Sequence, residues 1–331
     1  MNQTAPLTPP LSDDELALAD RLKRHVDTLA GTIGPRHQGQ MPTMDAAVAY
    51  IERELHEMGY AVERQGYFSG ADEVFNLEAQ IIGHKHPDRI VILGAHYDTI
   101  PETPGADDNA SAVAGLLEAA RLLIDHTPRC TIRFVAFANE EPPNFYTNTM
   151  GSQVYARMCR EKHVELIGMI CLEMIGYYAT GLDSQSYPSM LPLPLKKLLP
   201  KEGDFIGAVS DMRSALLLRR FRKGFRQRIK FPIVALPLPT SIHEIRLSDH
   251  SSFWDQGFRA LMVTDTSFFR NPHYHQPTDT PDTLDYHRVA RVTHLRDAEA
   301  ARRKRARIGI GRIGLSVRGW TWAAVVLMLV G

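Results

Sequence analysis

The chain has 331 residues, of which 44% are apolar and 23% are charged, and both values are ordinary for a soluble globular protein. Its formal net charge is zero, but residues 300–331 carry seven basic side chains and no acidic one, which leaves residues 1–299 at −7. A mildly acidic body lacks the basic footprint expected of a nucleic-acid-binding protein, so no nucleic-acid partner is expected.

The first half of the chain predicts helices and strands in alternation. A first helix begins at the capping box Ser12–Glu15 and ends near Gly31. A second runs from about Asp45 to Met58, where Gly59 is a stop signal. The apolar runs that follow predict strands around residues 61–63, 76–82, 90–93, 131–138 and 165–171. Helices are expected over the Ala- and Leu-rich segment 109–124 and near 152–161.

The second half is harder to interpret because prolines interrupt residues 180–228. A basic amphipathic helix is expected within that stretch, at about 213–226, and a closing helix begins near Tyr286. Apolar runs at 233–238 and 260–263 indicate strands. This alternation predicts an α/β fold with a mostly parallel, twisted central sheet covered by helices on both faces. We expect residues 1–298 to form a single domain.

The two ends and the cysteines give three smaller expectations. Residues 299–331 are basic and then apolar, and we expect them to lie outside the core. The apolar run Trp320–Val330 is shorter than the roughly 20 residues that span a bilayer, and a membrane-surface anchor is the alternative interpretation. The N-terminal residues lack the basic and apolar regions of a signal peptide, which predicts a cytoplasmic protein. Cys130, Cys159 and Cys171 are expected to be buried free thiols.

Polar side chains with metal-binding chemistry follow the apolar runs. His96 and Asp98 come directly after the strand predicted at 90–93, where ligand sites form in open α/β sheets, and Asp98 can hydrogen-bond the imidazole. Asp108 precedes the long helix and is well placed as its N-cap, where the helix dipole keeps a carboxylate ionised. Asp107 is interpreted as capping residue and surface charge, and Gly105 as the turn before them.

Three further segments complete a candidate metal site. Glu140 and Glu141 follow the strand at 131–138; one carboxylate can bind metal while the other faces a substrate water, although a solvated turn is the alternative. Glu173 ends an apolar run and should be nearly buried, which is costly for an unpaired carboxylate. His275 lies in a loop with little helical or strand character. Imidazole and carboxylate ligands suit a hydrolytic site for two divalent metals, zinc above all, with Co²⁺ or Mn²⁺ as substitutes.

The ordered segments GAHYD, GADDNAS, NEE, LEM and YHQPTDT give the chain a family resemblance. Over residues 15–298 it resembles the co-catalytic zinc exopeptidases of the bacterial aminopeptidase type, relatives of glutaminyl cyclases and glutamate carboxypeptidases. The segment Ser248–Thr266 also resembles the family stretch before the last ligand. The resemblance implies a phosphorylase/hydrolase-like fold and a peptide substrate with a free N-terminus.

The same resemblance implies a role for each residue of the site. Asp108 would bridge two zinc ions, His96 and Glu173 would complete one, and Glu141 and His275 would complete the other. Glu140 would act as general base and acid, and Asp98 would orient His96. The family commonly has Asp where this chain has Glu173, a longer arm that still reaches a metal.

Three other functions stay open at this stage. Glutaminyl cyclisation needs only one metal on the same fold, and carboxypeptidase action needs a basic pocket, for which Arg246 and Arg270 are candidates. A non-catalytic interaction module is the third alternative. The walls of a substrate pocket are expected from residues 180–228 and 273–280, and the oligomeric state is not assigned.

Overall fold

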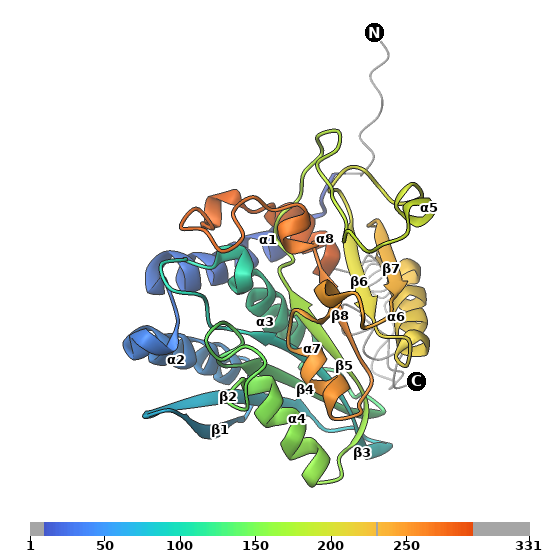
Figure 1. Cartoon of the computed structure of the whole chain (residues 1–331). Helices are drawn as coiled ribbons and strands as arrows, with labels where there is room; N and C mark the ends of the chain where they lie inside the picture. Colours follow the sequence, from blue (N-terminus) through green and yellow to red (C-terminus); the bar gives the residue numbers. More distant parts are fainter. Residues whose placement is uncertain (1–9, 230, 294–331) are drawn as a thin grey trace, which may run out of the picture.

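One eight-stranded sheet organises the protein (Figure 1). The computed structural model describes residues 10–229 and 231–293, so the tail expected over 299–331 lies outside the described residues. The strands are β1 (Val62–Ser69), β2 (Asp72–Ile81), β3 (His86–His96), β4 (Cys130–Phe137), β5 (Glu165–Glu173), β6 (Ile206–Ser210), β7 (Ile233–Pro237) and β8 (Ala260–Thr264). They lie in the order β1-β2-β4-β3-β5-β8-β6-β7.

The centre of the sheet is parallel. β3 pairs in parallel with β4 and β5, and β5 pairs in parallel with β8. Antiparallel pairing adds the hairpin β1-β2 on one side and β6 on the other, with β7 parallel to β6 at the edge. The prediction of a mostly parallel central sheet is confirmed, and the carboxyl ends of four neighbouring strands share one edge.

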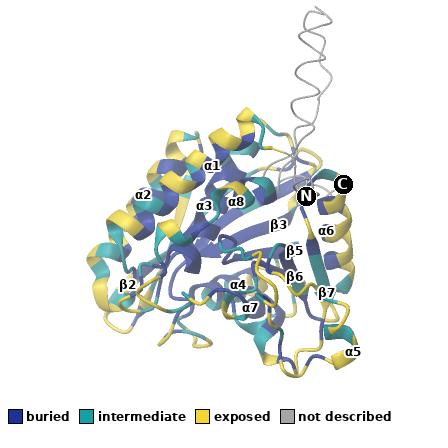
Figure 2. Ribbon diagram, turned by 90° about the horizontal axis from the view of Figure 1, so that it is seen from above, coloured by how far each residue is buried: buried dark blue, intermediate teal, exposed yellow. Residues whose placement is uncertain are grey.

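Helices cover both faces of this sheet (Figures 1 and 2). The α-helices are α1 (Asp13–Val26), α2 (Met41–Glu57), α3 (Ala112–Leu123), α4 (Gly151–Glu161), α5 (Leu193–Lys196), α6 (Ala215–Arg228), α7 (His250–Asp255) and α8 (Tyr286–Thr293). One buried apolar cluster joins α1, α2, α3, α6 and α8 to the sheet, and a second joins α4 and α7 to the other face. Along β3, Val91 and Leu93 belong to the first cluster, and Ile90 and Ile92 to the second. This is the two-residue alternation of a strand buried on both sides.

Several local predictions are confirmed. The Ser12 side chain accepts a hydrogen bond from the Glu15 backbone N–H, and the Glu15 carboxylate accepts one from Ser12, which is the predicted capping box of α1. The three cysteines are buried. Among the described helices, none is long and apolar enough to cross a membrane.

Several elements differ from the sequence prediction. The short helices α5 and α7 were not expected, because four and six residues are too few to show a helical period. β6 was not expected, because its five residues lie inside the proline-interrupted stretch and give too short an apolar run to separate from a loop. The long helix was expected to begin at residue 109, but α3 begins at Ala112, after the irregular turn Ala106–Ser111. This turn carries Asp108, one of the predicted site residues.

Candidate metal centre

The predicted site residues converge at the carboxyl edge of the parallel strands. His96 and Glu173 are the last residues of β3 and β5, and Glu140 and Glu141 follow β4. Asp108 lies in the turn before α3, and His275 in the loop before α8. Asp98 lies two residues after the end of β3. The structure therefore brings together the seven side chains predicted for the site, because the carboxyl ends of adjacent parallel strands meet at one edge.

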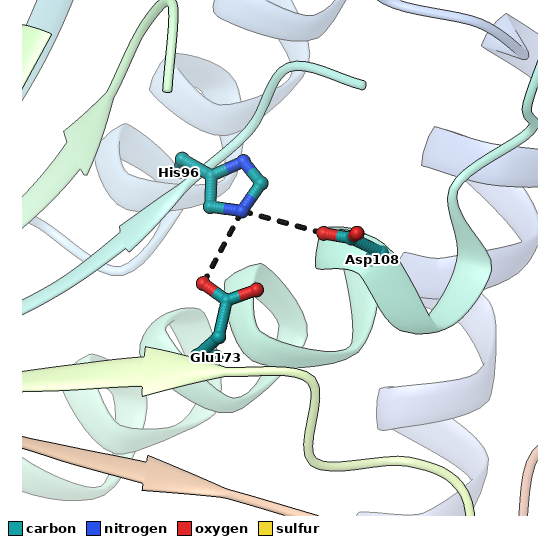
Figure 3. Close-up of side chains that lie close together, drawn as sticks. All are labelled: His96, Asp108 and Glu173. Atoms are coloured by element: carbon teal, nitrogen blue, oxygen red, sulfur yellow. Dashed lines mark ion pairs between the residues drawn. The ribbon is translucent and has the colours of Figure 1, made fainter. Parts of the chain in front are cut away.

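His96, Asp108 and Glu173 form the first group (Figure 3). The His96 Nε2 atom lies 3.4 Å from Asp108 Oδ1 and 3.3 Å from Glu173 Oε2. All three side chains are buried, as was predicted for Glu173. Figure 3 shows the imidazole nitrogen facing both carboxylates.

Asp108, Glu141 and His275 form the second group. The His275 Nε2 atom lies 3.2 Å from Asp108 Oδ2 and 3.3 Å from Glu141 Oε2. Asp108 thus directs one carboxylate oxygen to each group. Glu140 lies beside the first group, with its Oε2 atom 3.8 Å from His96 Nε2.

The electrostatics of the cluster fit a divalent cation. Burial raises the pKa of Glu141 to about 8 and the pKa of Glu140 well above its ordinary value. Burial opposes ionisation of Asp108 too, but the imidazoles of His275 and His96 bring the pKa of its carboxyl below the usual range. His96 Nε2 and Asp108 Oδ1 are buried without a hydrogen-bond partner among the described residues. Crowded carboxylates and unpartnered ligand atoms of N and O type match the donor set of a catalytic zinc site.

Asp98 contacts more than the imidazole that it was predicted to orient. Its Oδ1 atom lies 3.5 Å from His96 Nδ1, and its backbone oxygen lies 3.2 Å from the same nitrogen. The two carboxylate oxygens also accept the backbone N–H groups of Glu140 and Glu141, each at 3.0 Å. We call this arrangement, one carboxylate holding two consecutive backbone amides, an amide clamp.

A second amide clamp was missed by the sequence analysis. Asp279 accepts the backbone N–H of Asp107 at 2.9 Å and that of Asp108 at 3.1 Å. Asp279 lies four residues after His275, so one loop supplies a side chain to the second group and also holds the backbone of Asp108. The signal was present in the segment YHQPTDT, but an Asp in a loop has many surface roles and gives no hint of its distant partner.

Two interpretations of the GADDNAS segment were wrong. Asp107 is fully buried rather than a surface charge: its oxygens accept hydrogen bonds from the Gly176 N–H at 2.8 Å and the Asn271 side chain at 2.7 Å. Asp108 is not the N-cap of α3, because the helix begins at Ala112 and the N-cap position is occupied by Ser111, three residues after Asp108. The Asp108 backbone is non-helical, at φ −104° and ψ 89°. The predicted turn at Gly105 is present, with φ at +65°. Helical periodicity continues through this segment, which concealed the break.

Ser248 was also missed as a contact of the site. Its hydroxyl donates a 2.6 Å hydrogen bond to Glu173 Oε2, the oxygen that faces His96. Ser248 begins the segment Ser248–Thr266, which carries part of the family resemblance, but the sequence did not predict its contact with Glu173. The bond fixes the rotamer of the Glu173 arm.

An apolar cavity of about 110 Å³ opens beside Glu173. Its walls come from β6, β7 and β8, from the segment that begins at Gln185 and ends at Leu191, and from the aromatic residues Phe268, Phe269 and Tyr274. Glu244, Ile245 and Leu247 complete the lining on one side. The predicted walls, residues 180–228 and 273–280, supply part of this lining, whereas the contribution of β7 and β8 was not foreseen. The cavity lining contains no Lys or Arg.

Histidine and carboxylate clusters at the carboxyl edge of an open α/β sheet are typical of metal-dependent hydrolases. The chain belongs to Peptidase family M28, which it matches over residues 76–298. It is 36% identical to the uncharacterized protein YfbL of Escherichia coli (strain K12), over 83% of this chain and 85% of that protein. It is 28% identical to a probable zinc metalloprotease of Pyricularia oryzae, over 88% of this chain and 66% of that protein.

Solved structures show the same fold at low sequence identity. BSAP, a zinc aminopeptidase from Bacillus subtilis, has a TM-score of 0.64 at 16% identity, covering 82% of this chain and 91% of that one. A glutaminyl cyclase of Fimbriiglobus ruber has a TM-score of 0.58 at 18% identity, covering 88% and 95%. These similarities confirm the resemblance and the fold class predicted from the sequence.

Proposed function

We propose that this chain is a zinc-dependent aminopeptidase that removes N-terminal residues from peptides and holds two zinc ions. The observation that carries the proposal is the placement of Asp108, with one carboxylate oxygen in each of two histidine-carboxylate groups. Membership of Peptidase family M28 and the zinc metalloprotease and zinc aminopeptidase among the similar proteins support the same function.

The two groups supply the ligands of the proposed metals. His96, Asp108 and Glu173 would hold one ion, and Asp108, Glu141 and His275 the other. A pair of divalent ions in these positions would lower the pKa of a water molecule and polarise the scissile carbonyl group. Nitrogen and oxygen donors suit zinc and also accept Co²⁺ or Mn²⁺.

Glu140 is the proposed general base and acid. Its carboxylate is buried beside the first group, and the amide clamp of Asp98 fixes its backbone. From this position it takes a proton from the attacking water and returns that proton to the departing amine. Burial raises the pKa of Glu140, which favours a group that must hold the proton between the two steps.

Selection of the peptide N-terminus follows from the charge around the cavity. The acidic cluster attracts the α-ammonium group of a peptide, and the apolar cavity next to Glu173 accommodates the first side chain. A chain that must place its terminal ammonium at the cluster is cleaved only after its first residue. This arrangement supports an exopeptidase.

The alternatives have less support from the site. A carboxypeptidase needs a cation for the substrate carboxylate, but Arg246 pairs with Asp255, and Arg270 is buried against Gln185 and the Phe205 carbonyl. Neither arginine lines the cavity. Glutaminyl cyclisation remains the second candidate, because a glutaminyl cyclase has the same fold. A non-catalytic interaction module would have no use for two complete ligand groups.

A substrate panel and a metal analysis test the proposal together. Aminoacyl-nitroanilides, their N-acetylated counterparts and peptides with N-terminal Gln are offered to the zinc-reconstituted protein, and its metal content is measured. We expect hydrolysis of the substrates with a free amine, none of the acetylated ones, and two zinc ions per chain. Cyclisation of Gln peptides without hydrolysis would establish the second candidate, and less than one zinc per chain would favour the interaction module.

A further inference from the structure

We propose that the outer face of α6 docks this protein on an anionic phospholipid surface. The inference is independent of the peptidase proposal, because α6 contributes no residue to the metal centre. It rests on the charge, exposure and surroundings of a single helix. A basic amphipathic helix was expected in this stretch from the sequence, although the body as a whole is mildly acidic.

The outer face of α6 is a continuous basic surface. Five basic side chains are exposed on it: Arg219, Arg220, Arg222, Lys223 and Arg226. The helix contains no acidic residue. None of the five forms an ion pair or a side-chain hydrogen bond with another residue of the described part of the chain, whereas other basic residues such as Arg21 and Arg288 are paired.

Such a face is unfavourable without a partner. Arg219, Lys223 and Arg226 are three or four residues apart, so like charges lie next to one another along the helix. The opposite side of α6 is committed to the core, where Leu217, Phe221 and Phe225 pack on the sheet. The helix is therefore held in place with its charges turned outward, and an anionic partner would remove their mutual repulsion.

Exposed apolar side chains beside the basic residues favour a lipid surface over nucleic acid. Met212, just before α6, is 60% exposed, and Leu216, in the first turn of the helix, is 50% exposed. Leu216 lies on the same stripe as Arg220 and Lys223. Apolar side chains beside a basic stripe gain free energy at the boundary between headgroups and acyl chains, which a phosphate backbone does not offer. Polybasic segments are attracted to anionic leaflets, and the attraction weakens within a Debye length.

The position of α8 supports the same choice. α8 packs on the same face of the sheet as α6, because both contribute to one apolar cluster. The sequence after α8 contains eight Lys or Arg residues against two acidic ones, and then the apolar run 320–330.

Vesicle co-sedimentation of the full chain tests the proposal. Phosphatidylcholine vesicles with and without about one third phosphatidylserine are compared at low and high salt. We expect binding that requires phosphatidylserine and is lost at high salt, as in electrostatic docking. Equal binding to neutral vesicles, or no binding to either, would overturn the proposal. Tighter binding to a single-stranded RNA or duplex DNA oligonucleotide than to the anionic vesicles would overturn it as well.

The responsible face is identified with two charge-reversal variants. Arg219→Glu/Lys223→Glu should weaken binding to anionic vesicles at least about tenfold, because each basic residue contributes to the attraction. Arg160→Glu/Lys162→Glu makes the same change in net charge at exposed residues at the end of α4, on the other face of the sheet, and should bind nearly as well as the unmodified chain. Equal loss in both variants would show that net charge alone acts and would contradict a docking face. If the charge-reversal variant Arg219→Glu/Lys223→Glu does not fold, the neutral variant Arg219→Gln/Lys223→Gln is used in its place. Thermal melting equal to that of the unmodified chain shows that this neutral variant is folded.

Discussion

Two aspartates hold the backbone of the candidate centre rather than its metals. The amide clamp of Asp98 receives the N–H groups of Glu140 and Glu141, and that of Asp279 receives those of Asp107 and Asp108. Hydrogen bonds to a carboxylate are stronger than those between neutral groups. Each clamp therefore fixes the backbone of two consecutive residues, at least one of which belongs to the candidate centre. Asp279 is in this sense a positioning residue for Asp108.

Replacing Asp279 tests this positioning role. Asp279→Asn puts an amide donor against one of the two N–H groups, so Asp108 should lose its fixed direction. We expect zinc affinity to fall by about 10–100-fold, as for other groups that orient metal ligands. The measurement is a zinc titration against a competing chelating dye. Asp282→Asn, at an exposed residue of the same loop, is the control, and equal affinity in the two variants would contradict the role.

Replacement of Glu140 should leave the bound zinc intact, which distinguishes this residue from the proposed metal ligands. Glu140→Gln keeps the size of the side chain but cannot accept a proton. We expect kcat to fall by about 10²–10⁴ while both zinc ions stay bound. Kinetics on an aminoacyl-nitroanilide and metal analysis of the same sample check both parts. Turnover close to that of the unmodified chain would assign the proton transfer to another group.

At the scale of elements, β6 forms part of the cavity wall. Gly207 and Val209 line it, and Val209 is only partly buried. β6 separates β7 from the parallel strands and extends the sheet beyond the metal cluster. A strand that the sequence analysis did not predict thus lines the proposed site for the first side chain.

A larger side chain on β6 should change specificity rather than chemistry. Val209→Phe fills part of a cavity of about 110 Å³, so peptides beginning with Leu should lose kcat/KM more than those beginning with Ala. We expect a relative change of about tenfold, the scale of one or two methylene contacts. The measurement is the ratio of kcat/KM for Leu-nitroanilide to kcat/KM for Ala-nitroanilide, in the variant and in the unmodified chain. An unchanged ratio would show that the cavity does not select the first side chain.

Residues at the ends of strands were predicted from the sequence better than residues in the turns and loops that connect the strands and helices. His96 and Glu173 follow strongly apolar runs, so their positions at one sheet edge could be foreseen from topology alone. The turn that carries Asp108 could not, because its burial depends on Asp279, Gly176 and Asn271, far away in the chain. Contacts of this kind leave no local periodicity. β6 was missed for a related reason, since its identity as a strand depends on pairing with β7 and β8.

At the scale of the whole molecule, the metals should contribute to stability. The cluster joins residues of β3, β4 and β5 to the loop before α8, so ions held there connect distant parts of the chain. A ligand at a hundredfold excess over its Kd stabilises the folded state by about 2.7 kcal/mol. Removal of zinc by a chelator should therefore lower the Tm by about 5–10 °C.

Thermal melting with and without chelator gives this measurement. Returning zinc should restore the Tm, and Glu140→Gln should show the same decrease, because Glu140 is not a proposed ligand. A Tm that changes neither when the chelator is added nor when zinc is returned would contradict a metal centre at this position.

The carboxylate of Asp108 has a consequence for how the proposed centre fills. An ion bound through Oδ1 would settle the orientation of Oδ2, since the two atoms share one carbon and one side-chain torsion. The first ion to bind would thereby raise the affinity for the second ion, and loss of either ion would lower the affinity for the one that is still bound. Loading would then be cooperative, and the protein would pass between metal-free and fully loaded forms with little of the singly loaded state.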